Sequence, residues 1–188
     1  MDIEKYFALA KERLSSKRYH HIKEVTRLAG ELAQAYNVDK EKAMLAGALH
    51  DMTKEVSINE QLQMIKENGI ILDNISQKST NIFHSITGAI YAEKNLNIDD
   101  KDVLNAIRYH TTGRANMSML EKIVYTADTT SYERDYDGVE KLRELAFKDI
   151  DECMLCILEF TFSKIIKKRM VIAPDTLDCY NYLIEKNK

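Results

Sequence analysis

The dipeptide His50-Asp51 and four further residues carry the kinds of side chain that bind transition metals, and the four are His21, His84, His110 and Asp128. Imidazole nitrogens and carboxylate oxygens together suit iron, manganese, zinc or nickel better than calcium. A single histidine on an apolar helix face is usually a hydrogen-bonded core residue, so none of these residues is informative alone. If all six converge, they predict a metal site.

Helical spacing predicts that these side chains face inward. Residues at positions i, i+3, i+4 and i+7 share one face of a helix. His21 shares an apolar stripe with Val25, whereas the adjacent His20 lines up with Glu24 on a solvated face. Four of the five histidines lie on inward faces by this test, and His20 is the exception. Asp128 also follows an apolar stripe, where a carboxylate needs a cation or a hydrogen-bond partner.

The six residues divide into two sets of candidate ligands. One set has two histidines and two aspartates, His21, His50, Asp51 and Asp128, and the second joins His84 and His110 to Asp51 as a bridge. Two metal ions about 3.5–4 Å apart can hold a hydroxide and clamp the phosphoryl oxygens of an in-line displacement. No serine or cysteine nucleophile motif competes with this scheme. The sequence therefore predicts a two-metal phosphohydrolase in which a metal-bound hydroxide attacks phosphorus.

Polar or small residues near the expected ligands could bind the phosphates of a substrate, and they are Lys54, Thr111, Thr112, Gly113 and Arg134. The two cations can neutralise charge that builds in the transition state, so they join Asp51 as candidate catalytic residues. The two hydroxyls, and a residue that lacks a side chain, would let a ligand approach the backbone.

The composition predicts an all-α fold that forms a single-domain helical bundle. The chain has 188 residues with only 6 Gly and 1 Pro, so few residues interrupt helices. We expect one domain over residues 1–188, with a metal-binding core at about 17–134 and C-terminal helices at 137–186 packing on it. The expected helices are 2–14, 17–36, 40–51, 57–67, 80–95, 99–111, 118–132, 137–146, 149–169 and 175–186.

Several of these helices have recognisable ends. Asp39 and Asp99 are expected N-caps of the helices that follow them. Ser118 with Glu121 has the spacing of a capping box. Gly69 suits the left-handed residue that ends a helix.

Charge and hydropathy exclude some classes of partner. The net charge is −3 with a pI near 6.0, so nothing indicates a nucleic-acid footprint. The first residues lack an apolar signal core and no segment is long enough to span a membrane, so we expect a cytoplasmic protein. The three cysteines, Cys153, Cys156 and Cys179, are expected to be reduced core residues. The apolar C-terminal helices could serve a homodimer or only the core.

With these residues in place, the chain resembles the HD-domain superfamily of metal-dependent phosphohydrolases, through His21, His50-Asp51 and Asp128. It looks most like the YqeK family of bacterial HD proteins. The resemblance spans nearly the whole chain, and the matching segments are KRYHH at 17–21, AGALHDMTKE at 46–55, FHSITGA at 83–89, AIRYHTTGRANMSMLEKIVYTAD at 106–128 and RDYDGVEKLRELA at 134–146.

The resemblance implies a symmetrical diadenosine tetraphosphate hydrolase, which cuts the bridge of four phosphates in the middle to give two ADP. It also implies a di-metal centre, commonly with iron, whose ligands would be all six residues named at the outset. Lys54, Thr112, Gly113 and Arg134 would then lie near the phosphates.

The chain departs from the family in one loop. The family often has Ile-Glu-Pro-x-Arg after the last aspartate, and here Ser131 stands in place of the acid while Arg134 is kept. Two alternatives remain open at this point. One is an HD phosphohydrolase of another nucleotide, although the Gly-Tyr-Pro usual in cyclic-dinucleotide enzymes is absent. The other is a nucleotide-sensing protein whose metal site binds without catalysis.

Overall fold

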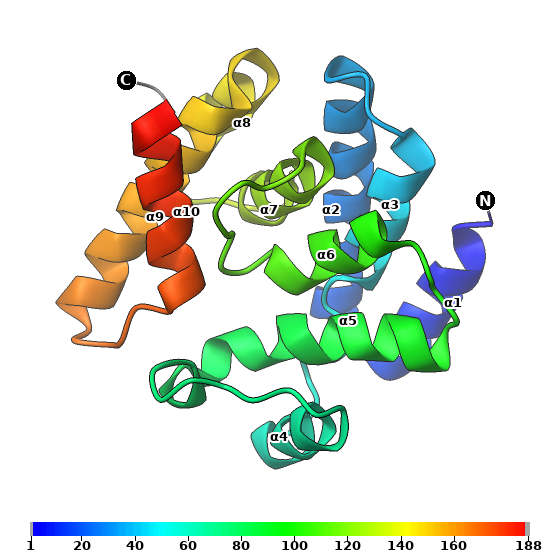
Figure 1. The fold of residues 1–188 in the computed structure, drawn as a ribbon. Helices are drawn as coiled ribbons and strands as arrows, with labels where there is room; N and C mark the ends of the chain where they lie inside the picture. The colour runs from blue at the N-terminus through cyan, green and yellow to red at the C-terminus, as the bar shows by residue number, and fades with distance from the viewer. Residues whose placement is uncertain (1, 187–188) are drawn as a thin grey trace.

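The computed structural model describes residues 2–186, and over that range it contains ten α-helices, two short 3₁₀ helices and no strand (Figure 1). This confirms the expected all-α class. The helices are α1 (Glu4–Arg13), α2 (Ser16–Ala35), α3 (Lys40–Leu49), α4 (Ile58–Glu67), η1 (Ser76–Lys78), η2 (Thr80–Ile82), α5 (Phe83–Asn95), α6 (Lys101–Tyr109), α7 (Met119–Thr130), α8 (Val139–Lys148), α9 (Ile150–Lys167) and α10 (Pro174–Lys186).

Local side-chain chemistry explains where several helices begin and end. The Asp39 side chain accepts hydrogen bonds from two backbone N–H groups at the start of α3. Ser118 and Glu121 form the expected capping box at the start of α7, with both reciprocal bonds present. Gly69 follows α4 with a φ of 70°, in the left-handed region that favours glycine. These three expectations are confirmed.

The expectation that Asp99 caps α6 is wrong by one residue. The N-cap is Asp100, whose carboxylate accepts hydrogen bonds from the backbone N–H groups of Asp102 and Val103 at 2.9 and 3.2 Å. Two adjacent aspartates are equally good caps by residue type. The choice depends on tertiary structure, because Asp100 also forms an ion pair with Lys42 of α3 at 2.8 Å.

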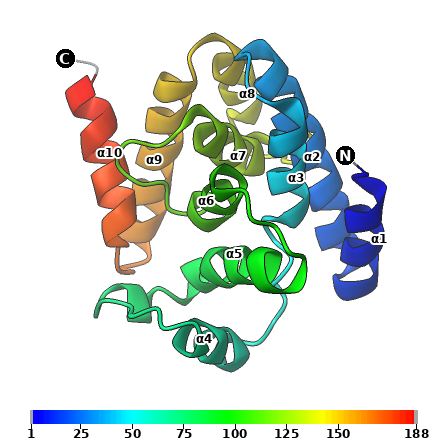
Figure 2. The ribbon, with the colours of Figure 1, turned by 45° about the vertical axis from the view of Figure 1, so that its right-hand side comes forward.

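The core lies among α2, α3, α6 and α7. The α2 helix packs on α3 and α7, α3 packs on α6, and α5 covers α6 from one side. A smaller apolar cluster joins α4 and α5 through Ile65 and Phe83. The C-terminal helices α8 to α10 lie on the opposite side of the molecule from α1 (Figures 1 and 2), and residues of α8 and α9 join the same apolar cluster as α2 and α3.

Two of the three cysteines are core residues, whereas Cys156 is only half-buried. Among the described residues none forms a disulfide, and Cys153 and Cys179 are buried. Burial raises the pKa of the Cys153 thiol to about 12 and that of Cys179 to about 11. Both thiols are therefore protonated at neutral pH and behave as small apolar side chains.

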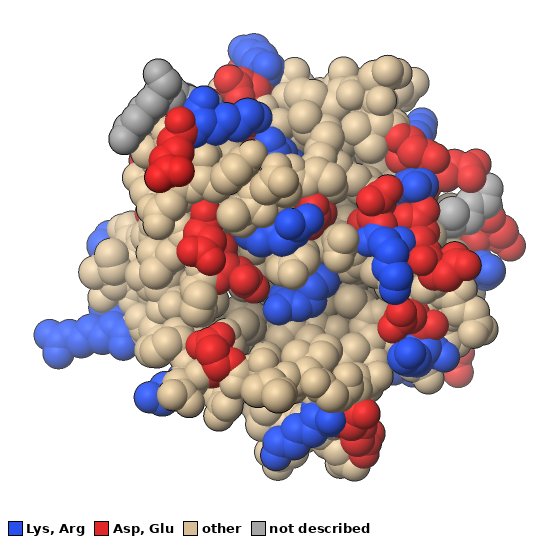
Figure 3. All heavy atoms as spheres, viewed as in Figure 1, with Lys and Arg blue, Asp and Glu red and all other residues tan. Residues whose placement is uncertain are grey.

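The surface agrees with the modest net charge. Figure 3 shows Lys and Arg interspersed with Asp and Glu on the face that it draws, without a broad basic surface. Within residues 2–186, no helix is both long and apolar enough to cross a bilayer.

Small residues in α3, just before His50, let α2 and α3 approach closely. A Cβ added to Gly47 would lie 3.0 Å from the Cα of Thr26 in α2. That neighbour is backbone and cannot turn aside. Gly30 is also helical and also tight, with Met44 Cγ at 3.0 Å, but that atom belongs to a flexible side chain.

We expect Gly47→Ala to destabilise the fold by about 1–3 kcal/mol, because the new methyl group forces two backbones apart. Gly30→Ala is the matched control, and we expect it to be neutral or slightly stabilising, since alanine gains about 1 kcal/mol of helix propensity and Met44 can move. Thermal and urea unfolding of both variants measures the difference. Equal stability of the two variants would contradict the packing argument.

Candidate metal centre

The helices bring the six candidate ligands to one point. His21 lies in the first half of α2, His50 is the C-cap of α3, and His110 is the C-cap of α6. His84 lies in the first turn of α5 and Asp128 in the last turn of α7. All four histidines are buried, whereas His20 is exposed, as the helix-face assignment expects.

Asp51 lies between two pairs of histidines. Its Oδ2 atom is 3.5 Å from Nε2 of His50 and 3.7 Å from Nε2 of His21. Its Oδ1 atom is 3.4 Å from Nε2 of His84 and 3.7 Å from Nε2 of His110. Each pair forms, with Asp51, a buried group whose ligand atoms lie within 4.8 Å of one another. One carboxylate oxygen therefore faces each pair, as a bridging ligand would.

Asp128 completes the first group. Its Oδ1 atom is 3.0 Å from Nε2 of His21 and 3.8 Å from Nε2 of His50. Burial alone would raise the pKa of Asp128, but the hydrogen bond from His21 and the charges of nearby histidines hold it well below its usual range. The carboxyl group of Asp51 behaves in the same way, with burial opposed by His50 and His110. Both aspartates are therefore ionised at neutral pH.

Three of the histidines are held by their Nδ1 atoms. His50 Nδ1 donates to the carbonyl oxygen of Gly47 at 2.7 Å, and His110 Nδ1 donates to that of Ile107 at 2.7 Å. His21 Nδ1 donates to Oε1 of Glu133 at 2.5 Å. A proton fixed on Nδ1 leaves Nε2 of His50 and His110 as the coordinating atom, which is the usual arrangement of metal-binding histidines. His21 differs: burial would lower its pKa, but its hydrogen bonds to Asp128 and Glu133 raise it, so a metal ion at its Nε2 would displace a proton.

The centre fits a divalent cation. The Oδ1 atom of Asp51 is buried without a hydrogen-bond partner. Nε2 of His21 is 3.3 Å from Nε2 of His50, and Nε2 of His84 is 3.1 Å from Nε2 of His110. Burial lowers the pKa of His50 and of His84, so both rings favour the neutral form, which is the form that binds metal. A cation between these four nitrogens and the two carboxylates would give each of them a partner, and the nitrogen and oxygen donors suit transition metals.

Positive side chains surround the centre. Arg18 Nη1 is 2.6 Å from Oδ2 of Asp51, and Lys54 Nζ is 3.0 Å from Nε2 of His84. Arg134 bonds both the carboxylate and the backbone oxygen of Asp128, at 2.9 and 3.0 Å. Arg18 and Arg134 are thus paired with the two aspartates, and Lys54 places a further cation beside His84.

The three residues after His110 have different surroundings. The Thr111 hydroxyl lies 3.1 Å from Nε2 of His84 and 3.0 Å from Nε2 of His110, directly at the centre. Thr112 is buried and its hydroxyl donates to the carbonyl oxygen of Gly113. Gly113 has a φ of 64°, and a Cβ there would lie 2.6 Å from the Cys179 sulfur. The close approach at Gly113 is therefore made by α10, and a ligand contact there stays a prediction.

Two residues at the centre were not expected from the sequence. Arg18 could have been found, because it lies three positions before His21 and so shares its helix face. Glu133 lies in the loop after α7, where no periodicity predicts direction. Its Oε1 atom accepts from His21 and also from the Ser131 hydroxyl, at 2.9 Å. The loop therefore has no carboxylate at Ser131, but the carboxylate of Glu133, two residues later, contacts the centre through His21.

We expect Glu133→Gln to weaken divalent-metal binding about tenfold or more, because it removes the negative charge that orients His21 and makes its Nε2 a stronger donor. The measurement is competition with a chromogenic chelator. Glu140→Gln serves as control, since Glu140 is exposed on α8. The same affinity in both variants would mean that Glu133 does not act through His21.

The chain is similar to known proteins over most of its length. The HD domain family matches residues 18–133 of the chain. The chain is 39% identical over 184 residues to the symmetrical bis(5′-nucleosyl)-tetraphosphatase of Halalkalibacterium halodurans, covering 98% of each. It is 36% identical to the protein of that name from Staphylococcus aureus, covering 97% of this chain and 94% of the relative.

A solved structure has nearly the same fold. It is described as a predicted HD superfamily hydrolase involved in NAD metabolism, from Clostridium acetobutylicum. The TM-score is 0.96 with 36% sequence identity, and the match covers 99% of this chain and 98% of the other.

Proposed function

The chain belongs to the HD domain family, and from that premise we propose that it hydrolyses diadenosine tetraphosphate symmetrically into two ADP. The observation that carries the proposal is the position of the buried Asp51 carboxylate. It lies between two pairs of histidines, with Arg18 and Lys54 close to the same group. Relatives that match nearly the full length of the chain bear the name of this activity.

The metal ligands of the proposed enzyme are the six converging residues. We propose that His21, His50, Asp51 and Asp128 hold one ion, and that His84 and His110 with Asp51 hold a second. Iron is the metal we propose first, and manganese, zinc or nickel suit the same donors. When bound, such ions polarise phosphoryl oxygens and lower the pKa of water.

The lysine and arginine side chains at the centre favour a polyphosphate as the substrate. The phosphate bridge brings several negative charges to a chain whose net charge is −3, so local positive charge is required. Burial lowers the pKa of Lys54, which makes a phosphate oxygen a favourable partner for its ammonium. Arg134 and Arg18 flank the two aspartates and can meet phosphate oxygens from the other side.

The leaving group needs little help from an acid. A nucleoside diphosphate leaves as an oxyanion, and that charge is stabilised by fixed cations more than by proton transfer. Lys54 and Arg134 are the proposed catalytic cations for this purpose. The Thr111 hydroxyl, within hydrogen-bonding distance of two imidazoles, is placed to orient the phosphate between them.

We expect hydrolysis in ¹⁸O-labelled water to give ADP as the main nucleotide product, with one labelled oxygen for each pair of ADP molecules. One water is consumed, the oxygen bridge between the two central phosphorus atoms breaks, and both products are the same nucleotide. Chromatography with mass spectrometry of purified metal-loaded protein measures this. AMP with ATP would show asymmetric attack, and no turnover would favour a binding protein.

We expect Lys54→Ala to lower kcat about 10–100-fold without loss of metal, since an ammonium stabilises phosphate charge but cannot be a ligand. Metal content and steady-state kinetics are measured on the same preparation. Lys66→Ala, on the exposed face of α4, is the control and should match the wild type. Loss of metal in the Lys54 variant would indicate a role in folding of the centre instead.

A further inference from the structure

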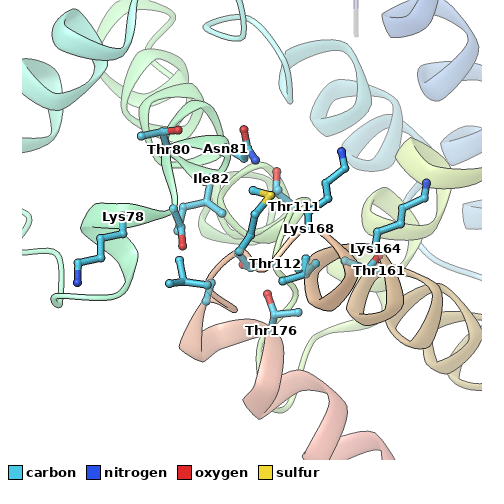
Figure 4. A pocket seen from close by; sticks show the side chains of 15 residues that line it. Lys78, Thr80, Asn81, Ile82, Thr111, Thr112, Thr161, Lys164, Lys168 and Thr176 are labelled. Carbon is cyan, nitrogen blue, oxygen red and sulfur yellow. The ribbon is translucent and has the colours of Figure 1, made fainter.

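A cavity of about 420 Å³ opens beside the metal centre (Figure 4). Its walls come from η1 and η2, from the residues after α6, from the last turns of α9 and from the segment that leads into α10. This volume falls in the range of about 300–1,000 Å³ that is usual for small-molecule sites. None of the six candidate metal ligands lines the cavity, so the cavity is distinct from the metal centre itself.

Thr111 connects the cavity to the metal centre. Thr111 lines the cavity. Its hydroxyl oxygen is within hydrogen-bonding distance of Nε2 of His84, at 3.1 Å, and of Nε2 of His110, at 3.0 Å. A molecule that fills the cavity and extends past Thr111 therefore reaches the second pair of histidines directly.

The cavity is positively charged. Lys78, Lys164 and Lys168 line it, and no aspartate or glutamate does. Within residues 2–186 none of the three forms an ion pair, and the ammonium of Lys164 lies over the rings of Phe160 and Tyr136. Figure 4 shows Lys164 and Lys168 extending side by side from α9, with Lys78 on the opposite side. Unpaired cations in a chain of net charge −3 indicate an anionic ligand.

The rest of the lining is apolar with a few polar groups. Ile82 and Ala173 are buried, and Met170 and Val171 are large apolar side chains left 45% and 38% exposed. Asn81 and several threonine hydroxyls lie among them (Figure 4). Apolar walls with few hydrogen-bonding groups suit a flat heterocycle joined to a sugar.

We propose that this cavity binds one nucleoside 5′-diphosphate half of the substrate. The base lies against the apolar wall, and the two phosphates run past Lys168 and Thr111 to the metal centre. The choice of ADP as the ligand rests on the proposed function. The cavity itself requires only a nucleotide whose phosphates point toward the histidines.

Two matched pairs of variants test the proposal, with ADP binding to metal-loaded protein measured by calorimetry. Lys168→Glu is expected to weaken binding about tenfold or more, because it reverses a charge beside the phosphates. Lys167→Glu, at the preceding residue, which ends α9 and does not line the cavity, should stay within about twofold of wild type. Ile165→Ala, in the cavity wall, should weaken binding several-fold, whereas Ile166→Ala, 65% exposed, should not.

Inorganic pyrophosphate separates the two parts of the ligand. Lys168→Glu should weaken binding of both pyrophosphate and ADP, while Ile165→Ala should weaken only ADP. If each variant binds ADP like its control, the cavity is not the nucleotide site, even when diadenosine tetraphosphate is cut into two ADP. If the wild type does not cut that substrate but the pairs differ as expected, the cavity assignment stands and the proposed function fails.

Discussion

The Asp51 carboxylate is the constraint on which the rest of the structure depends. A buried carboxylate costs free energy unless charges and hydrogen-bond donors surround it. Its partners come from four helices: Arg18 and His21 from α2, His50 from α3, His84 from α5 and His110 from α6. These four helices must therefore meet around this one side chain.

Helix ends and glycines make that closure possible. His50 and His110 each terminate a helix and bond a carbonyl three residues earlier in that helix. Their rings are therefore fixed by backbone rather than by other side chains, which are easier to displace. Gly88 contributes space, because a Cβ there would lie 3.1 Å from the His50 carbonyl oxygen. Two of the four histidine rings are thus held by main-chain contacts, whereas His21 is held by the Glu133 side chain.

Much of this arrangement could be predicted from the sequence, because helical periodicity assigns each side chain to a face. His20 and His21 differ by one position, yet only His21 is buried. Periodicity does not resolve tertiary choices between equivalent neighbours, so it cannot distinguish Asp99 from Asp100, which caps α6 and pairs with Lys42. It also fails in loops, where Glu133 owes its direction to contacts with α2. Pairing across the chain, rather than local propensity, decides those residues.

The packing of Gly113 on Cys179 has a consequence for the order in which the protein is made. The loop that carries Thr111 follows α6, but it rests on α10, through that contact and through Tyr182 donating to Asn116 at 3.0 Å. All six candidate ligands emerge from the ribosome well before α10 does. A nascent chain, or one shortened by a premature stop codon, thus holds every candidate ligand while lacking the support for their neighbouring loop. The loop beside the candidate ligands gains these contacts only once α10 has been made.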